Sequence, residues 1–348
     1  MTAATLTIHL DAIAANWRAL DAQSGPEVET AAVIKADAYG LGVSEVAKPL
    51  FDAGVRSFFV ATAEEGVKLY ATVGARAKIY VFSGQMASDN QIYYDFPLIP
   101  MLNSVDQVKR YLASDNQAGF GLQLDTGMNR LGMEADELTA SLTLLGDRKP
   151  ELVMSHLACS DEPDHPLNAS QLAEFHRMTD GHGWRRSLAA TGGILLGPDY
   201  HFDLCRPGVG LYGGAPFEDA KPVVTLSIPV IQTRTVQAGE TVGYGSHWTA
   251  GHSVRVATLA AGYADGILRT MGNNPPVLYT GETPCPLIGR VSMDLLTVDV
   301  TGLETVPDSL ELLNQYQSVD DLADAAGTIG YEILTSLGAR YNRRYSDA

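Results

Sequence analysis

The sequence predicts a closed (β/α)8 barrel of the TIM type, followed by a C-terminal, mostly antiparallel β domain. Over the first two thirds of its 348 residues, short β-rich runs alternate with segments whose apolar residues recur every three or four positions. This alternation is typical of repeated βα units around a parallel sheet. Eight such units can be counted, which favours a closed barrel over an open, doubly wound sheet. Near residue 222 the helical period nearly disappears and strands separated by turn signals take over.

The eight barrel strands are runs rich in β-branched and aromatic residues. They are expected at Ala31–Lys35, Phe58–Ala61, Lys78–Phe82, Pro97–Leu102, Gly119–Leu124, Glu151–His156, Ser187–Thr191 and His201–Arg206. The segments between them carry the helical period. Helices are expected at Val43–Phe51, Glu64–Thr72, Val105–Ala113, Ala135–Leu145 and Ala169–Thr179, after a first helix, Ala12–Ala22, that Asp11 can cap.

The second part of the chain is predicted to be a separate β domain that ends in short helices. Its strands are expected at Val223–Val236, Thr241–Gly245, Ser253–Ala260, Pro276–Thr280, Pro286–Ser292 and Leu295–Val300, with a helix at Val319–Ala326. The predicted domains are therefore residues 1–222 and residues 223–348.

Composition excludes several classes of function. The net charge of −17 argues against a nucleic-acid partner, because a phosphate backbone would be repelled. Three cysteines without a C-x-x-C pair indicate neither a disulfide framework nor a structural metal site. The N-terminus has no basic and apolar leader, and no apolar run is long enough to span a bilayer, so we expect a cytoplasmic protein without membrane contact.

Lys35 is the first candidate for chemistry. It closes the apolar run Ala31–Lys35 and is followed at once by A-D-A-Y-G-L-G. Burial lowers the pKa of an ammonium and exposes the neutral amine, the form that adds to carbonyls. A strand-terminal lysine can also extend its charge into solvent, so the position alone leaves both interpretations open.

Further candidates follow the carboxyl ends of other predicted strands, where barrel enzymes build their sites. Arg130 lies in D-T-G-M-N-R after the fifth strand, and His156 ends the sixth strand. Thr191, followed by two glycines, lies at the end of the seventh strand. Arg206 ends the eighth strand, and Gly208 and Val209 come shortly after it. Glycine-rich backbone at the last two positions can cradle a phosphate.

Two other sequence patterns are weaker evidence for a binding site. Residues 208–213 match G-x-G-x-x-G, but Pro207 precedes the match and no helix-forming stretch follows, so a dinucleotide site is not predicted. His156, Asp161, Asp164 and His165 could be drawn as a metal site; their spacing fits no helical ligand pair, and we predict no metal.

In the second domain, L-A-A-G-Y-A-D-G places Tyr263 in a glycine-bounded turn, and G-R-V-S-M-D places Met293 beside Asp294. Such a tyrosine can simply pack against a strand. Taken in order, however, V-I-K-A-D-A-Y-G, D-T-G-M-N-R, S-H-L-A, R-P-G, G-Y-A-D-G and G-R-V-S-M-D resemble the signatures of the alanine racemase family of pyridoxal-phosphate enzymes. The resemblance spans nearly the whole chain.

The resemblance implies a role for each matched residue. Lys35 would bind pyridoxal 5'-phosphate as a Schiff base, with Tyr39, Thr191, Gly208 and Val209 at its phosphate. Arg206 would face the pyridine nitrogen, His156 would link Arg206 to Tyr263, and Arg130 and the Met293 backbone would meet the substrate carboxylate. Lys35 and Tyr263 would be the two catalytic bases that interconvert L-alanine and D-alanine, in a homodimer whose sites each borrow Tyr263 from the partner subunit.

Two positions depart from the family pattern. Gln123 stands where some members carry a carbamylated lysine that steadies the arginine, so a neutral amide would have to orient Arg130. Ala339 stands where some members have tyrosine before Arg340, which leaves room for a wider pocket. A broad-specificity or serine racemase, and a barrel that binds pyridoxal phosphate without turnover, are therefore kept as alternatives.

Overall fold

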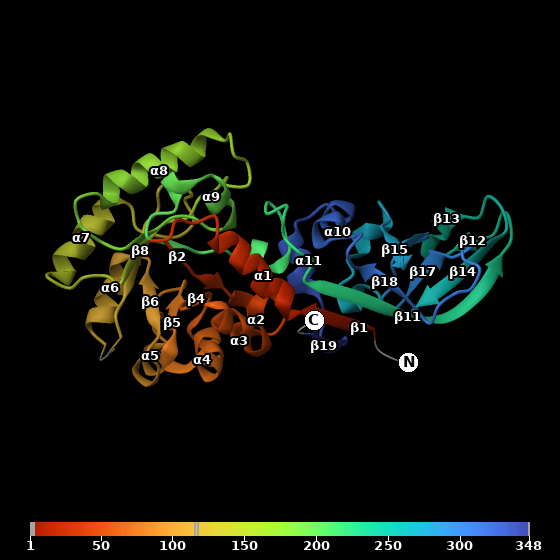
Figure 1. Ribbon diagram of the computed structural model, residues 1–348, viewed down its shortest axis with the longest axis horizontal. Helices are drawn as coiled ribbons and strands as arrows, with labels where there is room; N and C mark the ends of the chain where they lie inside the picture. The colour runs from red at the N-terminus through yellow and green to blue at the C-terminus, as the bar shows by residue number, and fades with distance from the viewer. Residues whose placement is uncertain (1–3, 115, 117, 347–348) are drawn as a thin grey trace. The chain divides into compact units, whose positions relative to one another are not determined.

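The computed structural model describes residues 4–114, 116 and 118–346, so the outer ends of the predicted domains, residues 1 and 348, lie outside the described residues. The chain forms two compact units (Figure 1). One unit comprises Ile13–Tyr212 with Pro216–Ala220; the other comprises the chain up to Ala12, Gly213–Ala215 and the chain from Lys221 onward.

The first unit is a barrel of short parallel strands. Its strands are β2 (Glu29–Thr30), β3 (Ala32–Val33), β4 (Ser57–Val60), β5 (Lys78–Val81), β6 (Ile99–Leu102), β7 (Gly121–Gln123), β8 (Leu152–Met154), β9 (Arg186–Ser187) and β10 (Leu204–Cys205). Strands β3 to β9 pair in chain order, and β10 pairs in parallel with β2. Backbone hydrogen bonds on both sides of β10 close the barrel. On one side Arg206 N–H donates to Ala189 O at 2.8 Å, and on the other side Ala31 N–H donates to Cys205 O at 2.9 Å. The predicted barrel is confirmed.

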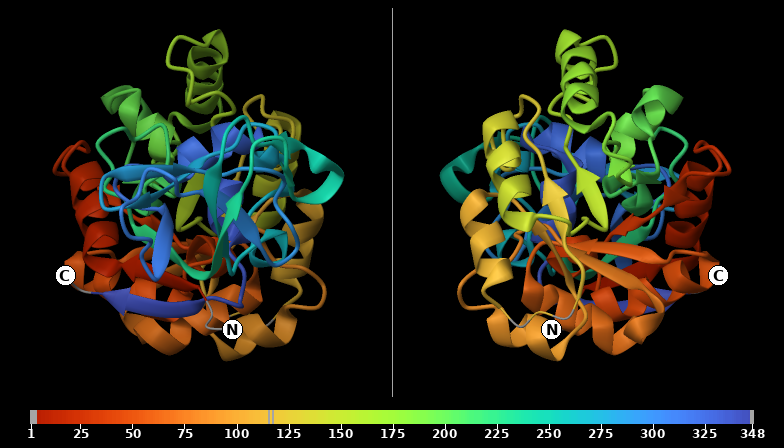
Figure 2. Two further views of the ribbon diagram at one scale, coloured as in Figure 1. Left: turned by 90° about the vertical axis from the view of Figure 1, so that its right-hand side faces the viewer. Right: turned by 90° about the vertical axis from the view of Figure 1, so that its left-hand side faces the viewer.

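Helices follow the strands and lie outside them (Figure 2). They are α1 (Leu10–Asp21), α2 (Lys35–Tyr39), α3 (Val43–Ala53), α4 (Ala63–Val73), α5 (Asn90–Asp95), α6 (Val105–Leu112), α7 (Ala135–Leu145), α8 (Pro166–Thr179) and α9 (Thr191–Leu195). Thr62 and Ser104 cap α4 and α6 with their hydroxyls, as their sequence positions favour. The expected cap at Asp11 is wrong: α1 begins at Leu10, so Asp11 lies in its first turn, where its charge still suits the helix dipole.

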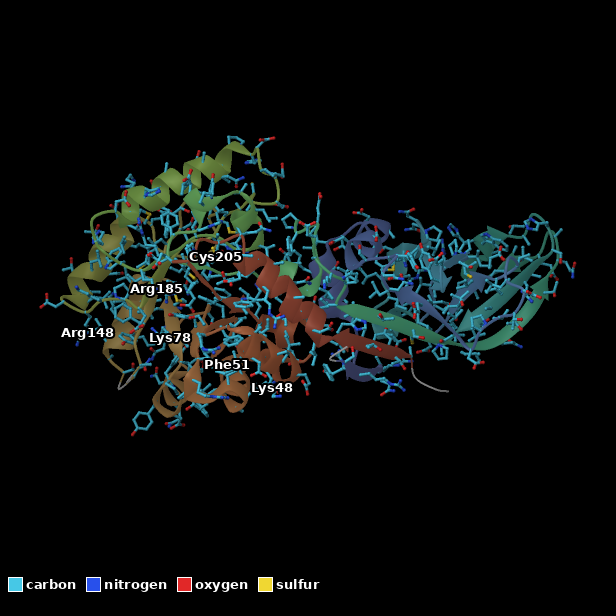
Figure 3. All side chains as sticks on the ribbon, viewed as in Figure 1. Lys48, Phe51, Lys78, Arg148, Arg185 and Cys205 are labelled. Carbon is cyan, nitrogen blue, oxygen red and sulfur yellow. The ribbon has the colours of Figure 1, made fainter. Side chains whose placement is uncertain are left out.

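Ion pairs tie the amino ends of the barrel strands together. Lys78 Nζ at the start of β5 lies 2.6 Å from Glu151 Oε2, just before β8, and Arg185 before β9 pairs with Glu29 at the start of β2. Lys78 and Arg185 are marked in Figure 3. This end of a barrel usually serves stability, and the opposite end serves chemistry.

The second unit is built on a largely antiparallel sheet in the order β16-β15-β18-β11-β1-β19, with β14 joining β11 to β17. The strands are β1 (Thr5–His9), β11 (Val224–Val236), β12 (Thr241–Val242), β13 (Trp248–Thr249), β14 (Val254–Leu259), β15 (Val277–Thr280), β16 (Thr283–Pro286), β17 (Leu296–Asp299), β18 (Ser309–Leu313) and β19 (Asn342–Ser346). Two helices, α10 (Val319–Ala326) and α11 (Gly330–Ser336), complete it.

Two expectations for this part of the chain are wrong. The start of the chain does not join the barrel, because β1 pairs with β11 (Leu6 opposite Leu226) and with β19. These partners lie more than two hundred residues away, beyond the reach of a local pattern. The expected strand Pro286–Ser292 does not form either: β16 ends at Pro286, and beyond it Leu287 forms an isolated antiparallel bridge with Val298. Among the described residues, no helix is both long and apolar enough to cross a membrane.

Candidate active site

The barrel brings five of the predicted side chains to one end. Lys35 follows β3, Arg130 lies in the loop after β7, His156 follows β8, Thr191 follows β9, and Arg206 follows β10. Since the strands are parallel, their carboxyl ends meet at one mouth of the barrel. Tyr263 and Met293 lie in the other unit.

Lys35 is half-buried, and its Nζ lies 5.8 Å from the centre of the Phe82 ring. Burial lowers the pKa of the Lys35 amine; the positive charge of Arg130 lowers it further, and Glu65 partly opposes the shift. A larger share of the amine is therefore neutral at pH 7 than for a lysine in water, as addition to a carbonyl requires.

The backbone after Lys35 is left-handed. Ala36, Asp37, Ala38 and Tyr39 have φ of 53°, 55°, 56° and 55°, and Gly40 has 83°. Each non-glycine residue in this conformation costs roughly 1–2 kcal/mol, so four in succession are rare. The expected strand to Lys35 therefore ends at Val33, and the turn presents Lys35 at the mouth of the barrel.

The turn also carries Tyr39 inward. The buried Tyr39 ring stacks on Tyr212 with centroids 4.5 Å apart, and the Tyr212 hydroxyl donates to Val33 O at 3.0 Å. A Cβ at Gly208 would lie 2.5 Å from the Tyr39 hydroxyl oxygen. Glycine is thus required here by close approach, and the backbone of the β10 loop lies against the Tyr39 hydroxyl.

Thr191 gathers backbone donors of the same loop. Its buried hydroxyl oxygen accepts from Gly208 N–H at 3.1 Å and from Gly210 N–H at 3.2 Å. Val209, between these glycines, is buried as well. Both N–H groups thus converge on the Thr191 hydroxyl, and the cradle for a phosphate at Thr191, Gly208 and Val209 stays a prediction.

Arg206 is a buried cation with neutral partners. Its guanidinium donates to Ser155 O at 2.7 Å, to Leu188 O at 3.4 Å and to the Ser187 hydroxyl. Within the described part of the chain, no carboxylate lies within ion-pair distance of it. Burial lowers the pKa of Arg206 to about 10, so it stays charged at pH 7. A buried charge without a counter-ion is costly, which favours a functional role.

His156 lies among cations. Burial, Arg206, Arg130 and Lys35, in that order, lower the pKa of its ring to about 3, so the ring is neutral at pH 7. In the described residues no hydrogen bond joins His156 to Arg206. The predicted link between the two stays a prediction.

Arg130 is exposed in a loop that Asp125 organises. The Asp125 carboxylate accepts from the N–H groups of Gly127, Met128 and Asn129 at 2.8, 3.0 and 3.2 Å. Gln123 does not bond Arg130: its amide donates to Leu131 O at 3.2 Å, and its buried Oε1 has no hydrogen-bond partner in the structure. Gln123 therefore supports the residue after Arg130.

Tyr263 and Met293 lie on adjoining turns of the β domain. Tyr263 N–H donates to Ser292 O, and Ala264 N–H to Met293 O, each at 3.0 Å. The Tyr263 and Met293 side chains are 41% and 53% exposed, so both are available to a partner. A Cβ at Gly262 would lie 2.2 Å from Ser292 O, and this close packing explains the glycine before the tyrosine.

Comparison with known proteins decides the family. The profile of the alanine racemase N-terminal domain matches residues 8–216, and that of the alanine racemase C-terminal domain matches residues 223–345. The chain belongs to the alanine racemase family. It is 60% identical over 345 residues to the alanine racemase of Cereibacter sphaeroides strain ATCC 17029, and 60% identical over 346 residues to that of Dinoroseobacter shibae, covering 99% of each chain.

Solved alanine racemases share the fold. The Bartonella henselae enzyme with covalently bound pyridoxal phosphate superposes with a TM-score of 0.91 at 36% identity, covering 99% of this chain and 100% of that one. The biosynthetic alanine racemase of Pseudomonas aeruginosa gives a TM-score of 0.92 at 36% identity, with the same coverage. The resemblance and the barrel-plus-β architecture expected from the sequence are confirmed.

Two residues that organise this candidate site were not predicted from the sequence. Glu65 on α4 bonds the turn after Lys35, and Arg340 bonds the turns of Tyr263 and Met293. The aspartates that Arg340 bonds lie in the two motifs, Asp265 two residues after Tyr263 and Asp294 directly after Met293, but nothing local marks Arg340 as their partner.

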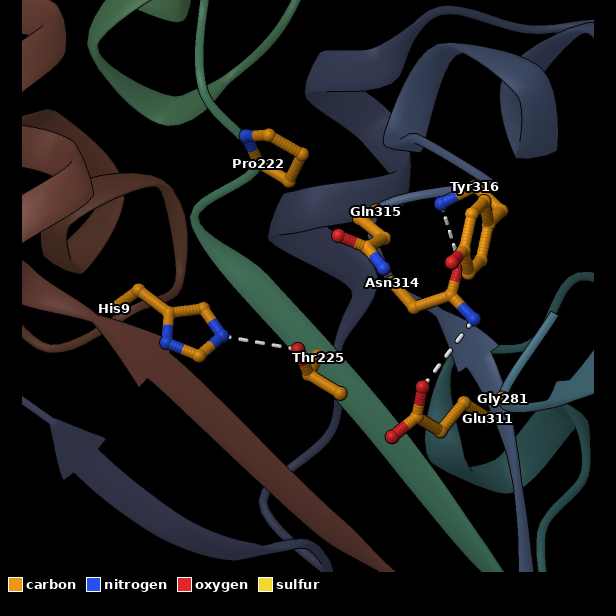
Figure 4. Close-up of a pocket in the computed structure, with 8 residues that line it drawn as sticks. All are labelled: His9, Pro222, Thr225, Gly281, Glu311, Asn314, Gln315 and Tyr316. Carbon is orange, nitrogen blue, oxygen red and sulfur yellow. Dashed lines mark hydrogen bonds between the residues drawn. The ribbon is translucent and has the colours of Figure 1, made fainter. Parts of the chain in front are cut away.

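A polar cavity of about 380 Å³ in the β domain contains none of the predicted site residues (Figure 4). Its walls include His9, which bonds the Thr225 hydroxyl at 2.9 Å, and Asn314, which donates to Glu311 at 3.3 Å. These groups partner one another, and we assign the cavity no part in the site.

Proposed function

We propose that this chain is a pyridoxal-phosphate-dependent racemase that interconverts L-alanine and D-alanine by a two-base mechanism. The observation that carries the proposal is Lys35, a half-buried amine of lowered pKa at the mouth of the barrel that also presents the Thr191 and Gly208 cradle. Full-length identity of 60% to proteins named alanine racemase supports the substrate.

The barrel mouth fits the proposed cofactor. Lys35 would hold its aldehyde carbon, and Tyr39, Thr191, Gly208 and Val209 would hold its phosphate. The fixed positive charge of Arg206 would face the ring nitrogen and disfavour its protonation. When bound, pyridoxal phosphate supplies an electron sink that makes the α-proton of an amino acid acidic.

Racemisation needs a proton removed from one face of the α-carbon and returned to the other. In the proposal, Lys35 serves one face through its Nζ and Tyr263 serves the other through its hydroxyl oxygen, each being acid in one direction and base in the other. A free tyrosine with a pKa near 10 is a poor base at pH 7. Arg130 and Arg206 would stabilise its phenolate by their positive charge.

The remaining residues orient the substrate. The exposed Arg130 guanidinium, which has no ion-pair partner among the described residues, would bind the substrate carboxylate together with the Met293 backbone. His156, neutral because burial and then the nearby cations lower its pKa, would link Arg206 to Tyr263.

We further propose that the working enzyme is a homodimer in which each site combines the barrel of one subunit with Tyr263 and Met293 of the other. The exposure of both side chains supports this, since each must reach a site outside its own unit. The barrel domain would bind the cofactor, and the β domain would supply the second base.

An absorption spectrum followed by chiral analysis tests the proposal. We expect a yellow protein, loss of the colour on borohydride reduction, and a reduced label on Lys35 by peptide mapping. Lys48, exposed on α3 and marked in Figure 3, is the internal control. A label on another lysine overturns the assignment. Faster turnover of D-serine than of D-alanine favours the serine alternative, and bound cofactor without turnover of either favours a non-catalytic binder.

A further inference from the structure

Glu65 departs from the role that its sequence position predicts. Thr62-x-x-Glu65 at the start of α4 matches a capping box, in which the glutamate reaches back to the N–H of the cap residue. Thr62 makes the bond expected of the cap residue, because its hydroxyl oxygen accepts from Glu65 N–H at 3.4 Å. The Glu65 carboxylate instead accepts from Ala61 N–H at 2.7 Å and from Ala36 N–H at 2.8 Å.

The two bonds join neighbouring strand ends. Ala36 is the first residue after Lys35, and Ala61 is the first residue after β4. Both carboxylate oxygens of Glu65 are used, so the N–H that begins the left-handed turn is tied to the adjacent strand of the barrel. Hydrogen bonds to a charged acceptor are about twice as strong as neutral ones.

The turn needs such support. Four successive alanine, aspartate and tyrosine residues have positive φ, and bonds within the turn, such as Gly40 N–H to Ala36 O at 2.7 Å and Gly42 N–H to Asp37 O at 2.9 Å, act together with the bond from Glu65. Strained backbone persists only where its surroundings over-determine it, and it gathers at functional sites.

We propose that Glu65 is a positioning residue that locks the left-handed turn and thereby fixes where the Lys35 amine lies. This deepens the proposed function, in which Lys35 binds the cofactor. Burial and the positive charge of Arg130 lower the pKa of Lys35, and the negative charge of Glu65 partly offsets that shift. Glu65 thus acts through backbone and charge, without touching the reacting atoms.

Hydrogen exchange of the full-length protein tests the lock. In Glu65→Gln only one oxygen remains as acceptor, and in Glu65→Ala none does. We expect the segment 34–42 to exchange about tenfold faster or more in both variants, as loss of a hydrogen bond to a charged group implies. Glu64→Gln, one residue away and exposed, is the matched control and should leave the exchange unchanged.

Amine labelling tests the electrostatic part. Cofactor-free protein, checked for folding by thermal melting, is treated with trace acetic anhydride from pH 7 to 11, and the Lys35 peptide is quantified against that of the exposed Lys48 on α3. Because Glu65 opposes the lowering of the Lys35 pKa, the midpoint for Lys35 should move to lower pH in Glu65→Gln and stay in place in Glu64→Gln.

A second substitution separates the two effects. Glycine adopts positive φ without the steric cost of alanine, and Ala36 is exposed, so Ala36→Gly removes strain without removing core. In the Glu65→Gln, Ala36→Gly double variant we expect the slow exchange of segment 34–42 to recover, while the labelling midpoint of Lys35 stays at the lower pH of Glu65→Gln. A general loss of folding would not be rescued in this selective way.

The outcomes are decisive in either direction. Unchanged exchange of segment 34–42 in Glu65→Ala, or an unchanged Lys35 midpoint in Glu65→Gln, overturns the proposal. Neither readout requires racemase activity. Failure of the proposed function would appear instead as a borohydride label away from Lys35 in the unsubstituted protein.

Discussion

Arg340 Nε lies 3.1 Å from the carboxylate of Asp265, the buried acid that closes the turn carrying Tyr263. The other carboxylate oxygen of Asp265 accepts from Gly262 N–H at 2.9 Å, immediately before Tyr263. Arg340 Nη1 also lies 2.7 Å from Asp294, the residue after Met293. One guanidinium therefore ties together the two turns that carry the exposed predicted residues of the β domain.

Arg340→Ala should therefore impair catalysis more than folding. The bridge between the guanidinium and Asp294, both half exposed, adds little to stability. Loss of the bridge to the buried Asp265 leaves that carboxylate without its cation and frees the Tyr263 turn. We expect kcat for alanine to fall by about 10- to 100-fold, the scale of a small misplacement of a catalytic group, with Arg340→Lys in between. Kinetics and thermal melting check this, with the exposed Arg344→Ala as control. A loss fully explained by unfolding contradicts the positioning role.

Thr191→Val should weaken binding of pyridoxal phosphate, while Thr191→Ser should not. The Thr191 hydroxyl oxygen accepts two backbone N–H groups, and in the proposal its hydrogen donates to a phosphate oxygen, a bond to a charged group worth about 1.5–3 kcal/mol that valine cannot make and serine can. Titration of cofactor-free protein with pyridoxal phosphate should show at least about a tenfold rise in Kd for the valine variant. Equal affinity for both variants removes Thr191 from the phosphate cradle.

The parts of this site that sequence patterns predict are those set by local chemistry. Lys35, His156, Thr191 and Arg206 each end a β-rich run, and a parallel barrel brings such ends together. The left-handed turn after Lys35 was not predictable, because Ala36 to Tyr39 have no intrinsic preference for it and the bond that begins it comes from Glu65, twenty-nine residues on.

The other features of the fold and the site depend on contacts between segments that lie far apart in the sequence. Leu6 on β1 reads as the start of an N-terminal domain, yet its partners are Leu226 and Arg343. Arg340 likewise reads as an ordinary basic residue near the C-terminus until folding brings it to Asp265. Such long-range contacts produce no periodic pattern in the sequence of either segment. The domain boundary and the Arg340 salt bridge could therefore be found only in the three-dimensional structure.

Acid should destabilise the barrel through His156. Its folded pKa of about 3 lies below the ordinary histidine pKa of about 6.5, so between these values the unfolded chain binds more protons than the folded one. Stability is therefore full above pH 6.5 and falls as the pH drops toward 3. Denaturant unfolding between pH 7 and 4 should show a smaller acid loss in His156→Gln than in the unsubstituted protein or in the exposed control His182→Gln. An identical slope in all three proteins assigns the acid sensitivity to other groups.

Tyr263→Phe should separate the two directions of proton transfer. If Tyr263 takes the proton from L-alanine and Lys35 takes it from D-alanine, racemisation should fall by about 100- to 10,000-fold, the range of general acid-base catalysis. Exchange of the α-proton of D-alanine with deuterated solvent should remain measurable by NMR. Tyr316→Phe, in the same domain and 42% exposed, is the matched control. Equal loss of exchange from both enantiomers would indicate a purely structural tyrosine.

Subunit exchange tests whether the two bases come from different chains. Lys35→Ala and Tyr263→Phe homodimers should each be nearly inactive. In a two-fold dimer with shared sites, each hybrid has one site with both native bases and one with neither. Random mixing makes half of the dimers hybrid and half of their sites intact, so roughly a quarter of the unsubstituted activity should return. Native mass spectrometry must show that exchange took place. Verified hybrids without activity would mean that Lys35 and Tyr263 act within one chain.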